Sequence, residues 1–278
     1  MLHSILVAVD GSPTSLSAAR YAALFAKAFE CKLRGLYVVD VRMRETPLIR
    51  DLVASTGLMP FQEYQPRLEE LMETRADTHL AALRDIVVAE GLEIQLEKQT
   101  GLIEEVIVKR AMSVDLLVMG QRGEHAQHRT DGFGTTAEAV LRRSSRPVLL
   151  CPDDYRQIMR PLVAYDGSDK SSRALALGAQ IAERLLLPLR ILAVADNERS
   201  GEEVLHEAID YMDSTRADYE AFIRLGDPAE EIVLCQREKL IDLMLMGAYG
   251  HGRLVKWLLG SVTEDVMKRV ATPLLVTR

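Results

Sequence analysis

The sequence has few aromatic residues and lacks a basic cluster, and both deficits restrict its partners. Aromatic side chains make up 5% of the 278 residues, which leaves little material for stacking on single-stranded nucleic acid. The net charge is −7, and no block of Lys and Arg stands out. The electrostatic footprint of a DNA- or RNA-binding protein is therefore absent, and we expect no nucleic-acid partner.

Long apolar runs and secretion signals are missing as well. The first residues, "MLHSILVAVDGS", show neither a basic region nor a cleavage site. No segment approaches the ~20 apolar residues that a membrane helix needs. The cysteines Cys31, Cys151 and Cys235 are scattered and odd in number, which favours reduced, mostly buried thiols. These features predict a soluble cytoplasmic protein without a membrane partner.

The two halves of the sequence repeat each other in order. "ILVAVDGS" and "PLVAYDGS" place Asp10 and Asp166 at the same spacing as Asp40 and Asp196. Later pairs, such as "VDLLVMG" and "IDLMLMG", are more closely spaced. The repeat therefore predicts two domains, 1–152 and 158–278, with an insertion near 42–75 in the first.

The insertion is rich in residues that interrupt secondary structure. Pro47, Gly57, Pro60 and Pro66 are expected to break it into a short helix, a loop and the start of a longer helix. We expect this segment to make an excursion on the surface.

Within each half, strand and helix patterns alternate. "ILVAV" is continuous and apolar, as a strand covered on both faces must be. Ser12 is expected to cap the next helix, with Pro13 in its first position. The alternation predicts a doubly wound α/β sheet with strand order 3-2-1-4-5 in each half. The fifth strands, 148–151 and 274–277, would be edges that seek partners.

A glycine-rich loop follows the fourth strand of the second half. It reads Gly247-x-x-Gly250 and, after nine residues, Gly260-Ser261 at the start of a helix. In such sheets ligands bind at the carboxyl ends of the strands, where Asp166 would face this loop. Glycines and the N–H groups of a helix start suit phosphate, and Asp166 suits a ribose hydroxyl. Tight turns after a strand are the alternative explanation for these glycines.

The stretches "ILVAVDGS", "DPAEEIV" and "DLMLMGAYGHGRLVKWLLGSVTEDVMKRVATPLLV" resemble the universal stress protein family in its tandem form. The resemblance implies that ATP or another adenine nucleotide binds the second half. Asp166 would meet the ribose and the Val194 backbone the adenine. The positions that would line the pocket or hold the phosphates are Met246, Gly247, Gly250, Gly260, Ser261 and Val262. The resemblance also implies that the fifth strands join an intramolecular pseudo-dimer, and further dimerisation is open.

The loop of the first half departs from this signature. The stretch between Gly123 and Gly134 is one residue longer, and Glu124 and Asp131 would disfavour phosphate if they pointed inward. The sequence leaves open whether this half binds a nucleotide. The positions that still fit the motif are Asp10, Val38, Met119, Gly120, Gly123, Gly134, Thr135 and Thr136.

Other candidate sites are weaker. His125, His128 and Asp131 have a spacing that a metal could use, but they are better explained as solvated loop residues, and Mg²⁺ would more plausibly arrive with a bound nucleotide. No catalytic residue is designated, and no group is marked to orient a water at a γ-phosphate. We expect slow ATP hydrolysis at most.

Three functions are compatible with these features. The leading hypothesis is an ATP-binding stress-response regulator, in which nucleotide alters a surface for an unknown protein partner. The alternatives are an ATP-using enzyme, either an ATPase or an adenylating relative, and an interaction scaffold without nucleotide.

Overall fold

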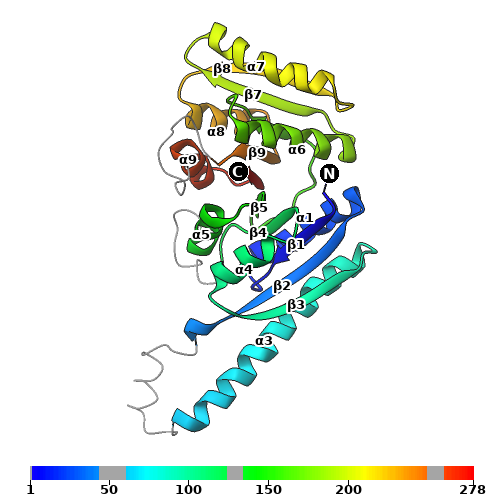
Figure 1. Ribbon diagram of the computed structural model, residues 1–278, viewed down its shortest axis with the longest axis vertical. Coiled ribbons are helices and arrows are strands. Elements are labelled where there is room, and N and C mark those ends of the chain that lie inside the picture. Colours follow the sequence, from blue (N-terminus) through cyan, green and yellow to red (C-terminus); the bar gives the residue numbers. More distant parts are fainter. Residues whose placement is uncertain (1, 44–60, 124–133, 249–259) are drawn as a thin grey trace.

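The computed structural model describes residues 2–43, 61–123, 134–248 and 260–278 (Figure 1). The elements of the first half are β1 Ser4–Ala8, α1 Pro13–Phe29, β2 Lys32–Asp40, the 3-10 helix η1 Val41–Met43, α3 Phe61–Ala89, β3 Ile94–Gly101, α4 Ile103–Ala111, β4 Leu116–Gly120, α5 Thr135–Arg143 and β5 Val148–Cys151. Those of the second half are β6 Pro161–Ala164, α6 Asp169–Leu185, β7 Leu189–Ala195, α7 Glu198–Asp213, β8 Tyr219–Leu225, α8 Pro228–Glu238, β9 Leu243–Gly247, α9 Ser261–Arg269 and β10 Leu274–Thr277.

The ten strands of the described residues form one continuous sheet that passes through both halves (Figure 1). Its order is β3-β2-β1-β4-β5-β10-β9-β6-β7-β8. Each half therefore has the predicted order 3-2-1-4-5, and its strands are parallel. The carboxyl ends of β1 and β4, and of β6 and β9, meet where the chain connections diverge, which is where this class of sheet binds ligands.

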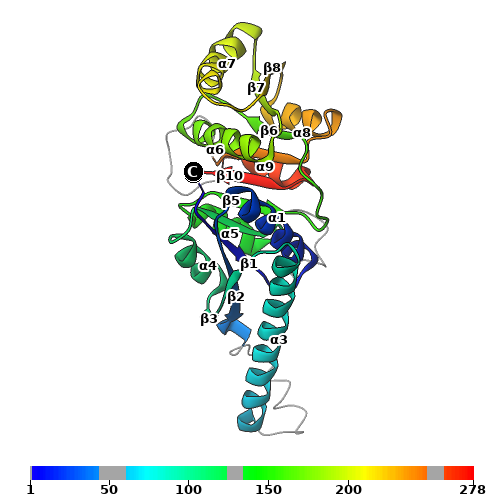
Figure 2. The same cartoon turned by 90° about the vertical axis from the view of Figure 1, so that its right-hand side faces the viewer.

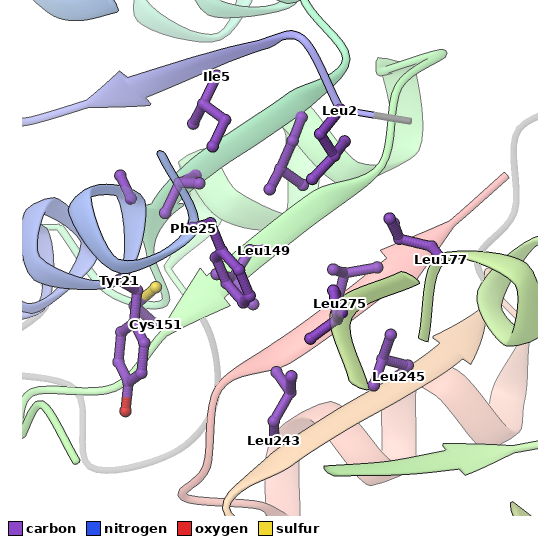
Figure 3. Packing of buried hydrophobic residues seen from close by; sticks show 14 of the residues in the cluster. Leu2, Ile5, Tyr21, Phe25, Leu149, Cys151, Leu177, Leu243, Leu245 and Leu275 are labelled. Carbon is purple, nitrogen blue, oxygen red and sulfur yellow. The ribbon is translucent and has the colours of Figure 1, made fainter. Parts of the chain in front are cut away.

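The halves join through their fifth strands, which confirms the expected pairing. β5 and β10 are antiparallel, with Leu149 opposite Leu275, and both side chains are fully buried (Figure 3). Burying a leucine contributes about 2 kcal/mol. The apolar core continues from Phe25 of α1 to Leu177 of α6 across this junction, so the halves share one core.

Helices cover both faces of the sheet. Residues of α1, α3, α6 and α7 pack in one apolar cluster, and residues of α4, α5, α8 and α9 pack in the other. The Ser12 hydroxyl accepts a hydrogen bond from the Ser15 N–H and Pro13 opens α1, as predicted. Ser168 caps α6 in the same way. These short caps bring the chain off each first strand directly into its helix, which leaves Asp10 and Asp166 at the strand ends.

The insertion lengthens α3, which has 29 residues against 16 in α7. The N-terminal part of α3 reaches beyond the sheet in both views (Figure 2). The prediction that Pro66 breaks the chain here was wrong, because Pro66 lies inside α3. It is the sixth residue of the helix, so it leaves the Gln62 carbonyl without its usual helical hydrogen bond, and the helix nevertheless continues past it. The other predicted breakers, Pro47, Gly57 and Pro60, lie outside the described residues. Across the described ranges, no helix combines the length and apolarity needed to cross a bilayer.

Candidate functional site

A cavity of about 410 Å³ opens at the carboxyl ends of β6, β7 and β9. Ligand pockets typically span about 300–1,000 Å³, so this one can hold a small organic molecule. Five of the predicted site residues line it together: Asp166, Val194, Met246, Gly247 and Val262. The strand order brings them to one crevice although they are distant in the sequence.

The Asp166 carboxylate is held in place by the helix cap behind it. Its Oδ1 accepts hydrogen bonds from the Ser168 N–H at 3.1 Å and from the Ser168 hydroxyl at 2.6 Å. The Ser168 hydroxyl in turn accepts from the Ser171 N–H at 3.2 Å. This network fixes the direction of the carboxylate at the cavity wall. A fixed carboxylate is an acceptor for a hydroxyl group of a ligand.

The backbone of Val194 also faces the crevice. The Leu192 carbonyl accepts from the Tyr165 N–H at 2.9 Å, and the pairing of β6 with β7 ends at Leu192. In a strand, alternate residues direct their backbone groups to the same side. The N–H and C=O of Val194 therefore point toward the space that β6 has left, where they offer one donor and one acceptor.

The loop after β9 begins with a close backbone approach. A Cβ on Gly247 would come within 2.9 Å of both the Lys170 Cβ and the Ser171 N, so only glycine fits. The Gly260 N–H donates to the Ala248 carbonyl at 3.0 Å, which joins the two described ends of this loop. Gly250, His251, Arg253, Lys256 and Trp257 lie outside the described residues.

The start of α9 carries no side-chain cap. Gly260 is its N-cap residue, and Ser261 and Val262 open the helix. The first N–H groups of a helix favour an anion when no side chain satisfies them. Gly260 and Ser261 are not among the residues that line the cavity, whereas Val262 and Thr263 are. The helix start therefore borders the cavity at the end nearest Gly247.

Cationic side chains gather beside this end. Desolvation by burial lowers the pKa of Lys170, the charges of Arg278 and Arg173 lower it further, and those of Asp166 and Asp169 oppose this without outweighing it. A lowered lysine pKa means that the ammonium form is disfavoured by its surroundings, which a bound anion would relieve. The electrostatics at the Gly247 end thus suit a negatively charged group.

The matching crevice of the first half is much smaller, at about 80 Å³. Of the predicted residues, Asp10, Val38, Gly120, Gly123 and Thr136 line it. Met119 is buried in the core, and Gly134 and Thr135 begin α5 at its border. The same residue types are thus brought together, but the volume lies below the usual range for a ligand of nucleotide size.

Side chains of α3 lie beside this crevice, against the turn that follows β1. His79 stacks on Tyr37, with ring centroids 5.7 Å apart, and the Arg75 Nε donates to the His79 Nε2 at 3.4 Å. In the second half, the corresponding residues of α7 are Ser200 and Val204, and both line the open cavity. The second half thus has the shorter side chains of Ser200 and Val204 where the first half has the longer ones of Arg75 and His79.

The His79 imidazole is neutral in this position. Desolvation by burial lowers the pKa of His79, the charge of Arg75 lowers it further, and Asp10 opposes both. A neutral imidazole can accept the hydrogen bond from Arg75 at Nε2. Burial and hydrogen bonding therefore hold this ring between α3 and the end of β1.

A second closure comes from Thr14, which occupies the position of Lys170. Its hydroxyl donates a short hydrogen bond to the Arg122 carbonyl. A Cβ on Gly123 would lie 3.2 Å from the Asp10 Oδ2, so the Gly123 backbone packs against the carboxylate. In the first half Gly123 thus lies beside the acid.

Sequence reasoning missed the α3 and α7 residues. The apolar pattern of the two helices could have identified them. Leu80 and Leu205 are buried at equivalent positions, as are Leu83 and Ala208, and these matches align α3 with α7. That alignment places Arg75 opposite Ser200 and His79 opposite Val204. The insertion obscured it, since it lies between the strand that ends at Asp40 and the aligned part of α3.

The remaining candidates contribute no site to the described part of the chain. His125, His128, Asp131 and Glu124 lie outside it, and within it no group of three metal-ligating side chains is found. The three cysteines are free, as predicted. Burial raises the pKa of Cys31 to about 11 and raises those of Cys151 and Cys235, so these thiols are protonated at neutral pH and are poor nucleophiles.

The comparisons with known proteins cover both halves. The model of the universal stress protein family matches residues 1–152 and 158–278. A universal stress protein of Synechocystis is 28% identical over 287 residues, which is 100% of both chains. The crystal structure of a universal stress protein from Archaeoglobus fulgidus covers 99% of this chain and 98% of its own, with 21% identity and a TM-score of 0.74. A universal stress protein in complex with cAMP is 29% identical over 44% of this chain and 98% of its own, with a TM-score of 0.38.

Proposed function

This chain belongs to the universal stress protein family in its tandem form, and we propose that its second half binds an adenine nucleotide, with ATP as the preferred ligand. The observation that carries the proposal is the 410 Å³ cavity whose wall includes both Asp166 and Gly247. An acceptor for a sugar and a glycine backbone for phosphate then flank one space at the ligand-binding edge of the sheet.

The residues that would hold the ligand follow from the geometry. The ribose hydroxyls would donate to Asp166, whose Oδ1 already accepts from Ser168. The Val194 N–H and C=O match the acceptor N1 and the donor 6-amino group of adenine. The apolar wall includes Leu192, Ile232 and Met246, which suits the faces of a purine.

The phosphates would lie at the Gly247 end. There the close approach of α6 to the β9 backbone, the uncapped start of α9 and the cations near Lys170 meet. Phosphate oxygens accept well from main-chain N–H groups at such a helix start. The N–H groups of Ser261 and Val262 would donate to the phosphates, while Gly260, whose own N–H donates to the Ala248 carbonyl, would let them approach the backbone. Mg²⁺ would be carried by the triphosphate rather than by a protein cluster.

The role that fits this site is regulatory. A nucleotide that joins Asp166, β9 and the start of α9 would order the rim of the cavity and alter a surface for a protein partner. Rapid hydrolysis would need a group that orients water at the γ-phosphate, and no residue of the described cavity wall is placed in that role here. We therefore expect phosphate release to stay near the uncatalysed rate.

The decisive test exploits the internal repeat. Asp166→Asn keeps an oxygen for the cap with Ser168 but removes the charge, and Asp10→Asn makes the same change in the first half, where Ser12 is the partner. In equilibrium dialysis with ATP, ADP and AMP, with and without Mg²⁺, the first variant should raise the ATP Kd at least about tenfold. The second should bind like the wild type. Equal binding by the wild type and the Asp166 variant would refute the site.

A further inference from the structure

We propose that Asp196 sets the base preference of the second site by accepting a hydrogen bond from the exocyclic amino group of adenine. This inference rests on the proposed function, because it concerns the base of the same ligand. Beyond Val194, the cavity wall continues through Ala195, Asp196, Ser200 and Val204. That end of the cavity is where a base would lie if the sugar meets Asp166.

The polar side chains at this end present acceptors. The Ser200 hydroxyl donates its hydrogen to the Asn197 carbonyl at 3.0 Å, so its lone pairs are what remain for the cavity. The Ser200 N–H donates to the Asn197 Oδ1 at 3.0 Å. A carboxylate such as that of Asp196 accepts hydrogen bonds and donates none. The base end of the described wall therefore selects for a donor.

Purines differ at this point of the ring. The 6-amino group of adenine has two hydrogens, one for the Val194 carbonyl and one for the Asp196 carboxylate. A 6-oxo purine places an acceptor there, and two facing acceptors leave both unsatisfied. A site built around a hydrogen bond rejects the analogue that lacks it more strongly than an apolar pocket rejects a change in size.

The first half provides an internal contrast. Asp40 occupies the position of Asp196, and the Arg42 Nε lies 2.9 Å from both of its carboxylate oxygens. Glu198 stands where Arg42 would be in the second half, and Ser200 stands where α3 has Arg75. In the first half the Asp40 carboxylate is thus paired with the Arg42 guanidinium. In the second half the Asp196 carboxylate lies on the cavity wall and has Glu198 two positions away.

The test compares ATP with inosine triphosphate, which differs by a 6-oxo group and a hydrogen on N1. We expect the wild type to prefer ATP. Asp196→Asn supplies an amide that can donate to the 6-oxo group, so the ratio of the two affinities should fall at least about tenfold. Glu198→Gln is the matched control. It also removes one negative charge, two positions from Asp196, but Glu198 does not line the cavity. Its ratio should stay at the wild-type value.

The outcomes separate the inference from its premise. Unchanged ratios in Asp196→Asn, or equal affinity of the wild type for both nucleotides, would overturn the role of Asp196 and leave the nucleotide site intact. If the wild type binds neither nucleotide, the proposed function itself fails. Asp196 is exposed, so thermal unfolding of the variant should match the wild type and verify that its fold is kept.

Discussion

His79 lies directly over Gly11: a Cβ on Gly11 would come within 2.0 Å of the imidazole Cε1. Gly11 also has a φ of +86°, in the left-handed region that side chains disfavour. Its counterpart Gly167 has a φ of +75°, but a Cβ there would meet nothing within 4 Å. The same turn therefore recurs in both halves, and only in the first does a helix side chain rest on it.

This difference predicts unequal costs for the same substitution. Gly167→Ala should lower the free energy of unfolding by about 1 kcal/mol, the cost of a left-handed alanine. Gly11→Ala should cost at least about 1 kcal/mol more, because His79 must leave its place against Tyr37. Urea unfolding followed by circular dichroism measures both. Equal losses would show that the imidazole moves without cost.

Much of the fold follows from local patterns in the sequence. A continuous apolar run predicted the buried strand β1 at Ser4–Ala8, and the Ser12-Pro13 pair predicted the start of α1. The repeat then predicted that both halves share one topology. Pro66 was misjudged because proline disfavours a helix interior without excluding it, and α3 continues on both sides of Pro66.

The candidate site was predictable only in part. The motif brought Asp166, Val194 and Gly247 to one crevice because strand order alone determines which ends meet. Which side chains lie beside the first crevice depends on how α3 packs against β2. No sequence motif encodes that packing. His79 and Arg75 carry no signature of their own and gain their effect from where the helix places them.

An acid-sensitive contact should be found at the start of β1. The Asp115 Oδ2 accepts from the His3 N–H at 2.8 Å and from the Ser4 N–H at 3.0 Å. Desolvation raises the pKa of Asp115, but these hydrogen bonds outweigh it, so the pKa lies below its ordinary value. Since the folded pKa is depressed, the stabilisation is present above the unfolded pKa of about 3.9 and is lost as the pH falls through the folded pKa.

Asp115→Asn should therefore lower the free energy of unfolding at pH 7 by about 0.5 kcal/mol, a small value because water screens a partly exposed carboxylate. The difference from the wild type should shrink as the pH falls below the unfolded pKa of about 3.9 and through the lower folded pKa. Urea unfolding at several pH values measures it, with exposed Asp153→Asn as the control. The same loss at pH 3 and pH 7 would contradict the assignment.

The exchange of two side chains between α3 and α7 predicts the binding stoichiometry. The first crevice measures about 80 Å³ against 410 Å³ in the second half, and His79 rests on Gly11 beside it, so we expect one ATP per wild-type chain by isothermal titration calorimetry. Placing the first-half residues in the second half, as Ser200→Arg with Val204→His, should fill that cavity and weaken ATP binding at least about tenfold. The converse pair, Arg75→Ser with His79→Val, should enlarge the first crevice and add a second, weaker site without affecting the first equivalent. Two equivalents of ATP on the wild type, with one lost in Asp10→Asn, would instead mean that the α3 side chains yield to the ligand.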